Sequence, residues 1–165
     1  MKKLKEHLDG VKICGSFRVQ ITEKEKGIVW DSGWTKNQIT DLGIRYFIID
    51  WLATGVGKSV THMALGTGIA PVAAATTLPG EITQHANSRA TVTKTIINSN
   101  TIQYAAVFSS DSPFLTETTL LSNVGLFDTS IVGSGQIFAG NIFTPQSCQT
   151  NQNVNMTYQI SFAGS

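Results

Sequence analysis

The sequence predicts a mainly β protein, an antiparallel, jelly-roll-like β-sandwich with one buried α-helix near residues 40–53. Segments in which apolar and polar residues alternate recur along the chain and are separated by turn residues, which is typical of sheets with one buried face. Only one stretch has apolar residues at helical spacing. The 165 residues, 41% of them hydrophobic, are enough for one domain with a substantial core. We therefore expect an N-terminal arm over residues 1–12 and a single β-sandwich domain over residues 13–165.

The first predicted hairpin follows the arm. From Cys14 to Ile21 the residues alternate, with Phe17, Val19 and Ile21 on one face, so this segment is predicted to be a half-buried strand. A charged turn ending at Gly27 leads into a second strand over residues 28–35.

The single predicted helix begins after Thr40, a residue suited to the N-cap, and ends at Gly55, a typical C-terminal stop. Asp41 suits the positive end of the helix dipole. Between these ends the helix is apolar on most sides, and such a helix is buried by sheets or by a partner.

The rest of the chain is predicted to form strands. Asn98–Asn100 is a turn between two alternating segments, which indicates a hairpin, and Pro145–Asn153 is predicted to be a polar loop. The expected strands cover residues 63–66, 89–96, 101–108, 120–127, 136–143 and 154–162.

The charges are few and unevenly placed. Charged residues make up 14% of the chain, the formal net charge is +1, and all 12 Lys and Arg fall at or before Lys94. A near-zero net charge creates no overall field that attracts nucleic acid. The second half is polar through uncharged side chains, which cost less to desolvate than charged ones. This composition favours contacts with other proteins, although a merely soluble β domain would also show it.

The N-terminal arm and two tryptophans are the candidate interface residues. Basic residues cluster in the arm, which either contacts an acidic surface or phosphate or is a solubilising tail. Leu4, Leu8 and Val11 have helical spacing. The interface residues that we single out are Lys2, Lys3, Lys5, Trp30 and Trp34.

No catalytic, cofactor-binding or metal-binding residue is predicted. Gly55–Ser59 lacks the first glycine of a phosphate-binding loop and follows a helix, and Gly66-Thr67-Gly68 lacks the third glycine of a dinucleotide fingerprint. The histidines, including His62 and His85, have no carboxylate or cysteine at metal-ligand spacing. Acid–base chemistry would need a pair drawn from the three carboxylates of the second half, Asp111, Glu117 and Asp128.

Other signals are weak. Cys14 and Cys148 could pair, but two cysteines do not make a disulfide framework. No apolar run approaches membrane-spanning length, and no apolar signal segment follows the first lysines. We therefore expect no membrane contact, and a chain that is made and kept in a cytoplasm.

Several short motifs, in order, resemble a pattern of tailed-bacteriophage virion proteins. In that pattern K-N-x-I-T-x-x-G leads a helix, I-A-x-G-T-G-x-x-x-P follows, and E-x-G-L-F-D comes later. The resemblance runs from about Val11 to Phe162. Its matching motif residues are Lys36–Gly43, His62–Gly68 with Pro71, Ala74–Leu78, Glu81, Arg89 and Asn123–Asp128. Asn123 stands where a Glu is commoner, so a pairing of that Glu with Arg89 is not carried over.

The resemblance implies a β-sandwich virion protein, either a capsid decoration or cement protein or a tail- or fibre-associated part, with no catalytic residues. We therefore expect a non-enzymatic structural component of a virion that docks on other virion proteins and forms a homo-oligomer, with a trimer as the form suggested by analogy.

Two alternatives stay open. One is a host-surface carbohydrate or receptor-binding module in which Trp30, Trp34, Tyr104 and Tyr158 stack on a sugar, if they are exposed. The other is a glycan hydrolase, which needs two carboxylates facing each other across a cleft.

Overall fold

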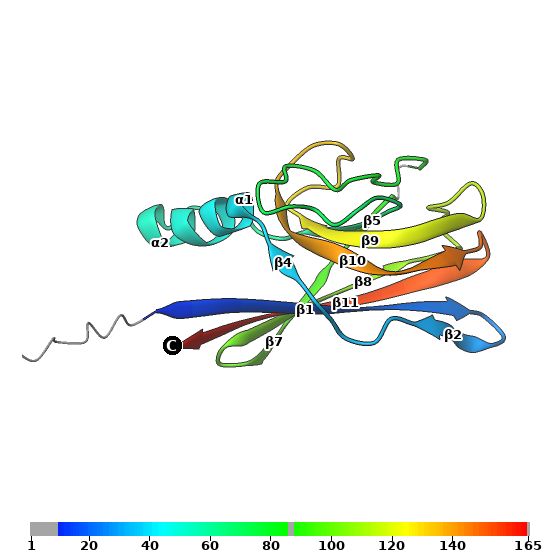
Figure 1. The fold of residues 1–165 in the computed structure, drawn as a ribbon, viewed down its shortest axis with the longest axis horizontal. Helices are drawn as coiled ribbons and strands as arrows, with labels where there is room; N and C mark the ends of the chain where they lie inside the picture. Colours follow the sequence, from blue (N-terminus) through cyan, green and yellow to red (C-terminus); the bar gives the residue numbers. More distant parts are fainter. Residues whose placement is uncertain (1–9, 86–87, 165) are drawn as a thin grey trace, which may run out of the picture.

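Two antiparallel sheets lie one above the other in the computed structural model, which describes residues 10–85 and 88–164 (Figure 1). One sheet has the order β2-β1-β11-β8-β7, with β3 also pairing with β1, and the other has the order β4-β10-β9-β5-β6. The prediction of a mainly β chain with antiparallel sheets is confirmed. The strands are β1 (Val11–Glu23), β2 (Gly27–Asp31), β3 (Thr35–Lys36), β4 (Gln38–Ile39), β5 (His62–Gly66), β6 (Arg89–Thr91), β7 (Thr93–Asn98), β8 (Thr101–Phe108), β9 (Thr119–Phe127), β10 (Ile137–Cys148) and β11 (Gln152–Gly164).

The core lies between the sheets and is built from the alternation that the sequence shows. Strands β1 and β11 pair along their whole length, from Val11 opposite Gly164 to Glu23 opposite Gln152. Every second side chain of this pair points inward, and those in the middle of the sheet are buried: Phe17, Val19 and Ile21 on β1, and Val154, Met156, Tyr158 and Ile160 on β11.

Two strand predictions need correction. The segment 89–96 is not one strand, because β6 pairs with β5 in one sheet whereas β7 pairs with β8 in the other. Pro145–Asn153 is not a loop, because β10 continues to Cys148 and only residues 149–151 turn. The register shifts between Ile142 and Gln146, and a strand whose outer face is exposed can carry polar residues there.

The predicted helix forms, and both of its predicted ends are confirmed. It comprises α1 (Asp41–Ile44), the π-helical turn η1 (Arg45–Ile49) and α2 (Asp50–Thr54). The Thr40 hydroxyl accepts a hydrogen bond from the backbone N–H of Gly43, and Gly55 ends the helix in the left-handed conformation at φ 71°.

The prediction that this helix is buried is wrong as far as the chain's own sheets are concerned, and burial by a partner stays a prediction. Gly43 is its only buried residue, because the helix lies at one end of the sandwich and not between the sheets (Figure 1). Only one side of it packs on the strands, where the Phe47 ring lies 5.0 Å from that of Phe138. Much of the apolar surface of the helix therefore stays exposed.

The arm predicted over residues 1–12 falls mostly outside the described residues, but its last three residues are described. Val11 and Lys12 belong to β1, opposite Gly164 and Ala163. Within the described part of the chain, no helix is long and apolar enough to cross a membrane.

Candidate binding groove

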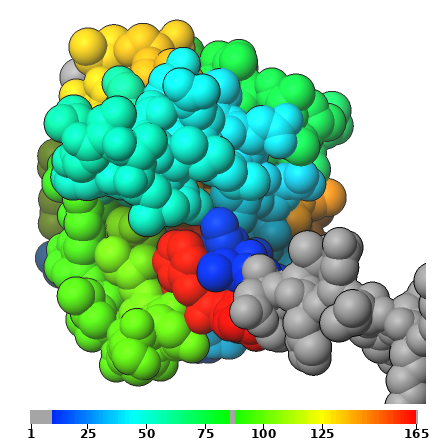
Figure 2. Space-filling model, turned by 90° about the vertical axis from the view of Figure 1, so that its left-hand side faces the viewer, coloured from blue at the N-terminus to red at the C-terminus, as the bar shows by residue number. Residues whose placement is uncertain are grey.

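An apolar groove of about 590 Å³ opens at the end of the sandwich where the helix lies. Figure 2 views this end: the helical segment lies above, the β7–β8 hairpin lies below, and the surface is hollowed between them. The groove is lined by side chains of the helix, of the segment that follows it and of strands β7, β8, β10 and β11: Phe47, Ile48, Trp51, Lys58, Ser59, Val60, Lys94, Ile96, Asn98–Ile102, Tyr104, Phe138, Ile160 and Phe162.

The floor of the groove is the inner face of the six-stranded sheet. Ile160 on β11 lies opposite Ile102 on β8, which in turn lies opposite Ile96 on β7. These residues share a face with the buried Tyr104, two positions along β8. The apolar inner face therefore continues past the core and into the groove.

This floor is open because the second sheet does not extend over it. In Figure 1 the ends of β1, β11 and β7 run out beneath the helix, beyond the strands of the other sheet. As a result Ile96 is 80% exposed and Val11 is 72% exposed, although both lie on the inner face.

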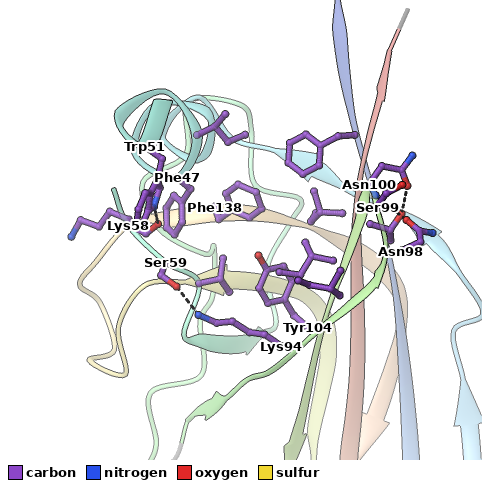
Figure 3. A pocket seen from close by; sticks show the side chains of 17 residues that line it. Phe47, Trp51, Lys58, Ser59, Lys94, Asn98, Ser99, Asn100, Tyr104 and Phe138 are labelled. Atoms are coloured by element: carbon purple, nitrogen blue, oxygen red, sulfur yellow. Dashed lines mark hydrogen bonds between the residues drawn. The ribbon is translucent and has the colours of Figure 1, made fainter. Parts of the chain in front are cut away.

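The roof is the underside of the helix. Phe47 and Trp51 point down from it toward the strands, and Phe47 rests on Phe138 (Figure 3). Ile48 also lines the groove. The Trp51 indole N–H donates to the backbone carbonyl of Lys58 at 3.0 Å. This hydrogen bond ties the C-terminal end of the helix to the segment that leads into β5.

A few polar groups edge the groove. The Lys94 ammonium donates to the Ser59 hydroxyl at 2.5 Å and closes one side, and the Lys58 ammonium lies 2.7 Å from the Asp128 carboxylate. Burial raises the pKa of Tyr104, whose hydroxyl has no hydrogen-bond partner among residues 10–85 and 88–164. The described lining holds no carboxylate, histidine or cysteine. Its chemistry is suited to holding an apolar side chain or segment.

The predicted interface residues do not meet at this groove. Lys2, Lys3 and Lys5 lie outside the described residues. Trp30 on β2 pairs with Ile21 on β1. Ile21 lies ten residues along β1 from Val11, and at the usual rise of a strand this separation is about 33 Å. The Trp30 ring packs 5.7 Å from that of Phe143, whereas Trp34 is 51% exposed. Their role as interface residues stays a prediction.

The structure bears on both alternative functions, the sugar-binding module and the glycan hydrolase. Tyr104 and Tyr158 are buried, and the Tyr158 hydroxyl donates to Asn37 Oδ1 at 2.5 Å, so neither can stack on a sugar at the surface. Glu117 and Asp128 flank the nine-residue strand β9 and stand about 30 Å apart, too far to act as a pair.

The structure also shows how the candidate metal ligands and the two cysteines are arranged. Among the described residues no three side chains of His, Cys, Asp or Glu are arranged to hold a metal ion. Cys14 is an exposed thiol and Cys148 a buried one, and the two are not bonded to each other.

Asn123 does not interact with Arg89, the partner that a Glu at position 123 would have suggested. Arg89 pairs with Glu81, and the buried Asn123 amide donates to the carbonyls of Ile69 and Pro79 at 2.9 and 2.7 Å. A Glu carboxylate could not make these two bonds, because it has no hydrogen to donate.

The sequence pattern predicts no groove at this end of the molecule. The pattern predicts an apolar helix and an alternating strand at 89–96. Nothing in the pattern shows that one sheet extends past the end of the other. The signal that pointed to the groove residues is the helix that is apolar nearly all round, since such a helix needs a second covering surface. Comparisons of this chain with protein-family models, with curated proteins and with solved structures found no match.

Proposed function

We propose that this chain is a non-enzymatic structural component of a tailed-phage virion, a capsid decoration or cement protein or a tail accessory subunit, that docks through protein–protein contacts. The observation that carries the proposal is the exposed apolar outer face of the helix. The uncovered apolar residues of the helix include Ile44, Ile49 and Leu52, and Leu52 is 84% exposed. Several large apolar side chains exposed on one helix are typical of an interaction site.

The resemblance to phage proteins supports the same proposal, because its motif residues have structural partners in the fold. The Thr40 hydroxyl donates to the carbonyl of Ile137 at 2.6 Å and joins the helix start to β10. A side chain at Gly43 would meet the Phe138 carbonyl oxygen at 2.1 Å, so this position favours glycine. Motif residues that hold a scaffold together fit a structural subunit.

The proposal extends to arrangement and assembly. A jelly-roll-like sandwich is supported by the connections β8–β9 and β10–β11, which pass from one sheet to the other. A homo-oligomer, with a trimer as the expected form, is supported by β7, an edge strand whose six residues are all exposed.

The test is quantitative mass spectrometry of particles purified from the source of this chain. We expect a fixed copy number per particle, near one to a few per capsomer for a decoration protein and a handful per particle for a tail part. Leu52→Glu should abolish incorporation, whereas Ile28→Glu, an exposed control on β2 far from the helix, should not. Absence of the wild-type chain from the particles would overturn the proposal.

A host-binding module keeps one supporting residue, the exposed Trp34. If it is the correct function, Trp34→Ala should abolish binding of the purified chain to host cells, and Leu52→Glu should leave that binding unchanged.

A further inference from the structure

We propose that the apolar groove binds an amphipathic anion, a small molecule with a carboxylate at one end and an aliphatic tail at the other. The carboxylate lies against Lys94, Ser59 and Tyr104, and the tail lies along the apolar floor toward Phe162. Fatty acids of medium length are the simplest members of this class. The inference is independent of whether the protein belongs to a virion.

The size and the lining of the groove suit a small molecule. Its volume of about 590 Å³ lies within the usual range for ligand pockets, roughly 300–1,000 Å³. Such pockets are lined mainly by apolar side chains, with a few polar groups that orient the ligand. This groove has the same pattern, with the helix above and the continued inner face of the sheet below (Figure 2).

The Tyr104 hydroxyl is a polar group that faces the groove without a protein partner. Tyr104 is only 9% exposed, and its hydroxyl points into the groove (Figure 3). It makes no hydrogen bond to any residue of 10–85 or 88–164. Because buried polar groups in proteins are nearly always paired, an unpaired one that faces a cavity indicates where a polar atom of a ligand binds.

Two further donors lie on the same side of the groove. Lys94 on β7 is the cross-strand neighbour of Tyr104 on β8, so the two side chains leave the same face of the sheet. The Lys94 ammonium donates to the Ser59 hydroxyl at 2.5 Å. An ammonium has three hydrogens and a hydroxyl has one, so both groups can still donate to a ligand.

The positive charge of Lys94 is not balanced within the described lining. Its hydrogen-bond partner there is a neutral hydroxyl, and that lining contains no carboxylate. A ligand carboxylate accepts hydrogen bonds at both oxygens and donates none, which complements a group of donors. Its bond to an ammonium is also stronger than a bond between neutral groups. A cationic head group would instead meet Lys94 with the same charge.

The rest of the floor suits an aliphatic tail. Beyond Tyr104 the floor continues through Ile102 and its strand neighbour Ile160. Phe162 lies at the far end, four residues along β11 from Tyr158, the strand neighbour of Tyr104, and this separation is about 13 Å. A tail of about ten carbons spans roughly this distance, since each C–C bond of about 1.5 Å advances an extended tail by about 1.25 Å.

A tail without polar groups fits the middle of the groove better than a peptide backbone does. Between Ser59 and Asn100 the groove is walled by aromatic and aliphatic side chains, including Phe138 (Figure 3). A peptide lying there would bury N–H and C=O groups that need partners. An aliphatic tail has no such groups, so we assign the groove to a small amphiphile.

Calorimetric titration of the full-length protein with decanoate, below the concentration at which it forms micelles, tests the proposal. We expect saturable binding of a single decanoate. Decan-1-ol has the same tail without the charge and should bind about tenfold more weakly, and decyltrimethylammonium should bind more weakly still. Binding of decan-1-ol as tight as that of decanoate, or no saturable binding of decanoate, would overturn the proposal.

Two conservative variants test the carboxylate site. Lys94→Met removes the charge and Tyr104→Phe removes the hydroxyl, and both keep most of the side-chain volume. Each should weaken decanoate binding by about fivefold or more, because each removes a hydrogen-bond donor. Lys24→Met, an exposed control in the turn between β1 and β2, should leave binding unchanged. Unchanged binding in either groove variant would contradict the assigned site.

A matched pair on β7 tests the position of the tail. Ile96 lines the groove and is 80% exposed, whereas the adjacent Ile97 is not among the described lining residues and is 47% exposed. Ile96→Glu should weaken decanoate binding several-fold, and Ile97→Glu should not. Equal binding by the two variants would contradict the position of the tail. A dimer that Ile96→Glu dissociates and that decanoate does not displace would assign the groove to a second copy and would also overturn the proposal.

Discussion

Arg89 and Glu81 form a two-point ion pair inside the second sheet. Arg89 Nε and Nη2 lie 2.5 and 3.0 Å from the two carboxylate oxygens of Glu81, and both side chains are almost fully buried. Arg89 Nη1 donates to the carbonyls of Thr129 and Ser134, and the guanidinium lies 3.7 Å from the centre of the Phe127 ring. The pair thus connects β6 to the loop that follows β9.

Breaking this pair should destabilise the fold strongly. Glu81→Gln keeps the shape of the side chain but leaves the Arg89 charge buried without a counter-charge, which costs about 3–5 kcal/mol in free energy of unfolding. Urea denaturation measures the loss. The control is Glu23→Gln, which removes the surface pair with Lys26 and should cost at most about 1 kcal/mol. Equal losses in the two variants would contradict the assigned role of the buried pair.

Asn123 should not tolerate a carboxylate. Its amide nitrogen donates to two loop carbonyls in a fully buried position, and Asn123→Asp replaces that donor with an oxygen that faces both carbonyls. Leaving buried polar groups without partners costs about 1–3 kcal/mol for each neutral group and more for a charged one. We expect a loss in that range by urea denaturation at neutral pH, smaller at acid pH where the new carboxyl is protonated. A stability equal to that of the wild type would show that the loop carbonyls do not depend on Asn123.

The two cysteines should differ sharply in reactivity. Cys14 is exposed, whereas Cys148 is buried and its burial raises the pKa of the thiol to about 11. Since the thiolate is the reactive form, an aromatic disulfide reagent at pH 8 should titrate one thiol in the native chain and two in denaturant. Cys14→Ser should abolish the native reaction. If no thiol reacts even in denaturant, the two cysteines are paired in a disulfide.

His62 should make stability depend on pH near neutrality. Burial, with a smaller contribution from the Arg89 charge, lowers the pKa of His62 below its usual value. The unfolded chain therefore binds this proton more readily than the folded chain, so the stabilising contribution is complete above about pH 6.5 and is lost as the pH falls through the folded pKa. Urea midpoints measured from pH 7.5 to pH 5 should fall more for the wild type than for His62→Gln. Parallel curves would contradict the prediction.

The sequence could predict elements whose signal is local. The alternation of Val154, Met156, Tyr158 and Ile160 identifies a strand with one buried face, and the structure buries these side chains. Thr40 and Gly55 mark the helix ends because caps depend on a side-chain oxygen and on a positive φ, both of which are properties of single residues.

The sequence could not predict features that depend on distant segments. Arg89 reaches Glu81, Thr129 and Ser134 only because three segments meet, and no spacing along the chain encodes that meeting. The groove also depends on segments that are distant in the sequence. It exists because the inner face of one sheet continues past the end of the other, and periodicity shows which side of a strand is apolar but not what lies opposite.

The amino-acid sequence by itself therefore determined the class of the protein and the faces of its strands, because backbone geometry converts residue type and spacing directly into local structure. The tertiary structure decided that the apolar helix is a half-exposed roof and that Ile96 and Val11 border an open groove, because exposure depends on how far each layer extends over the other.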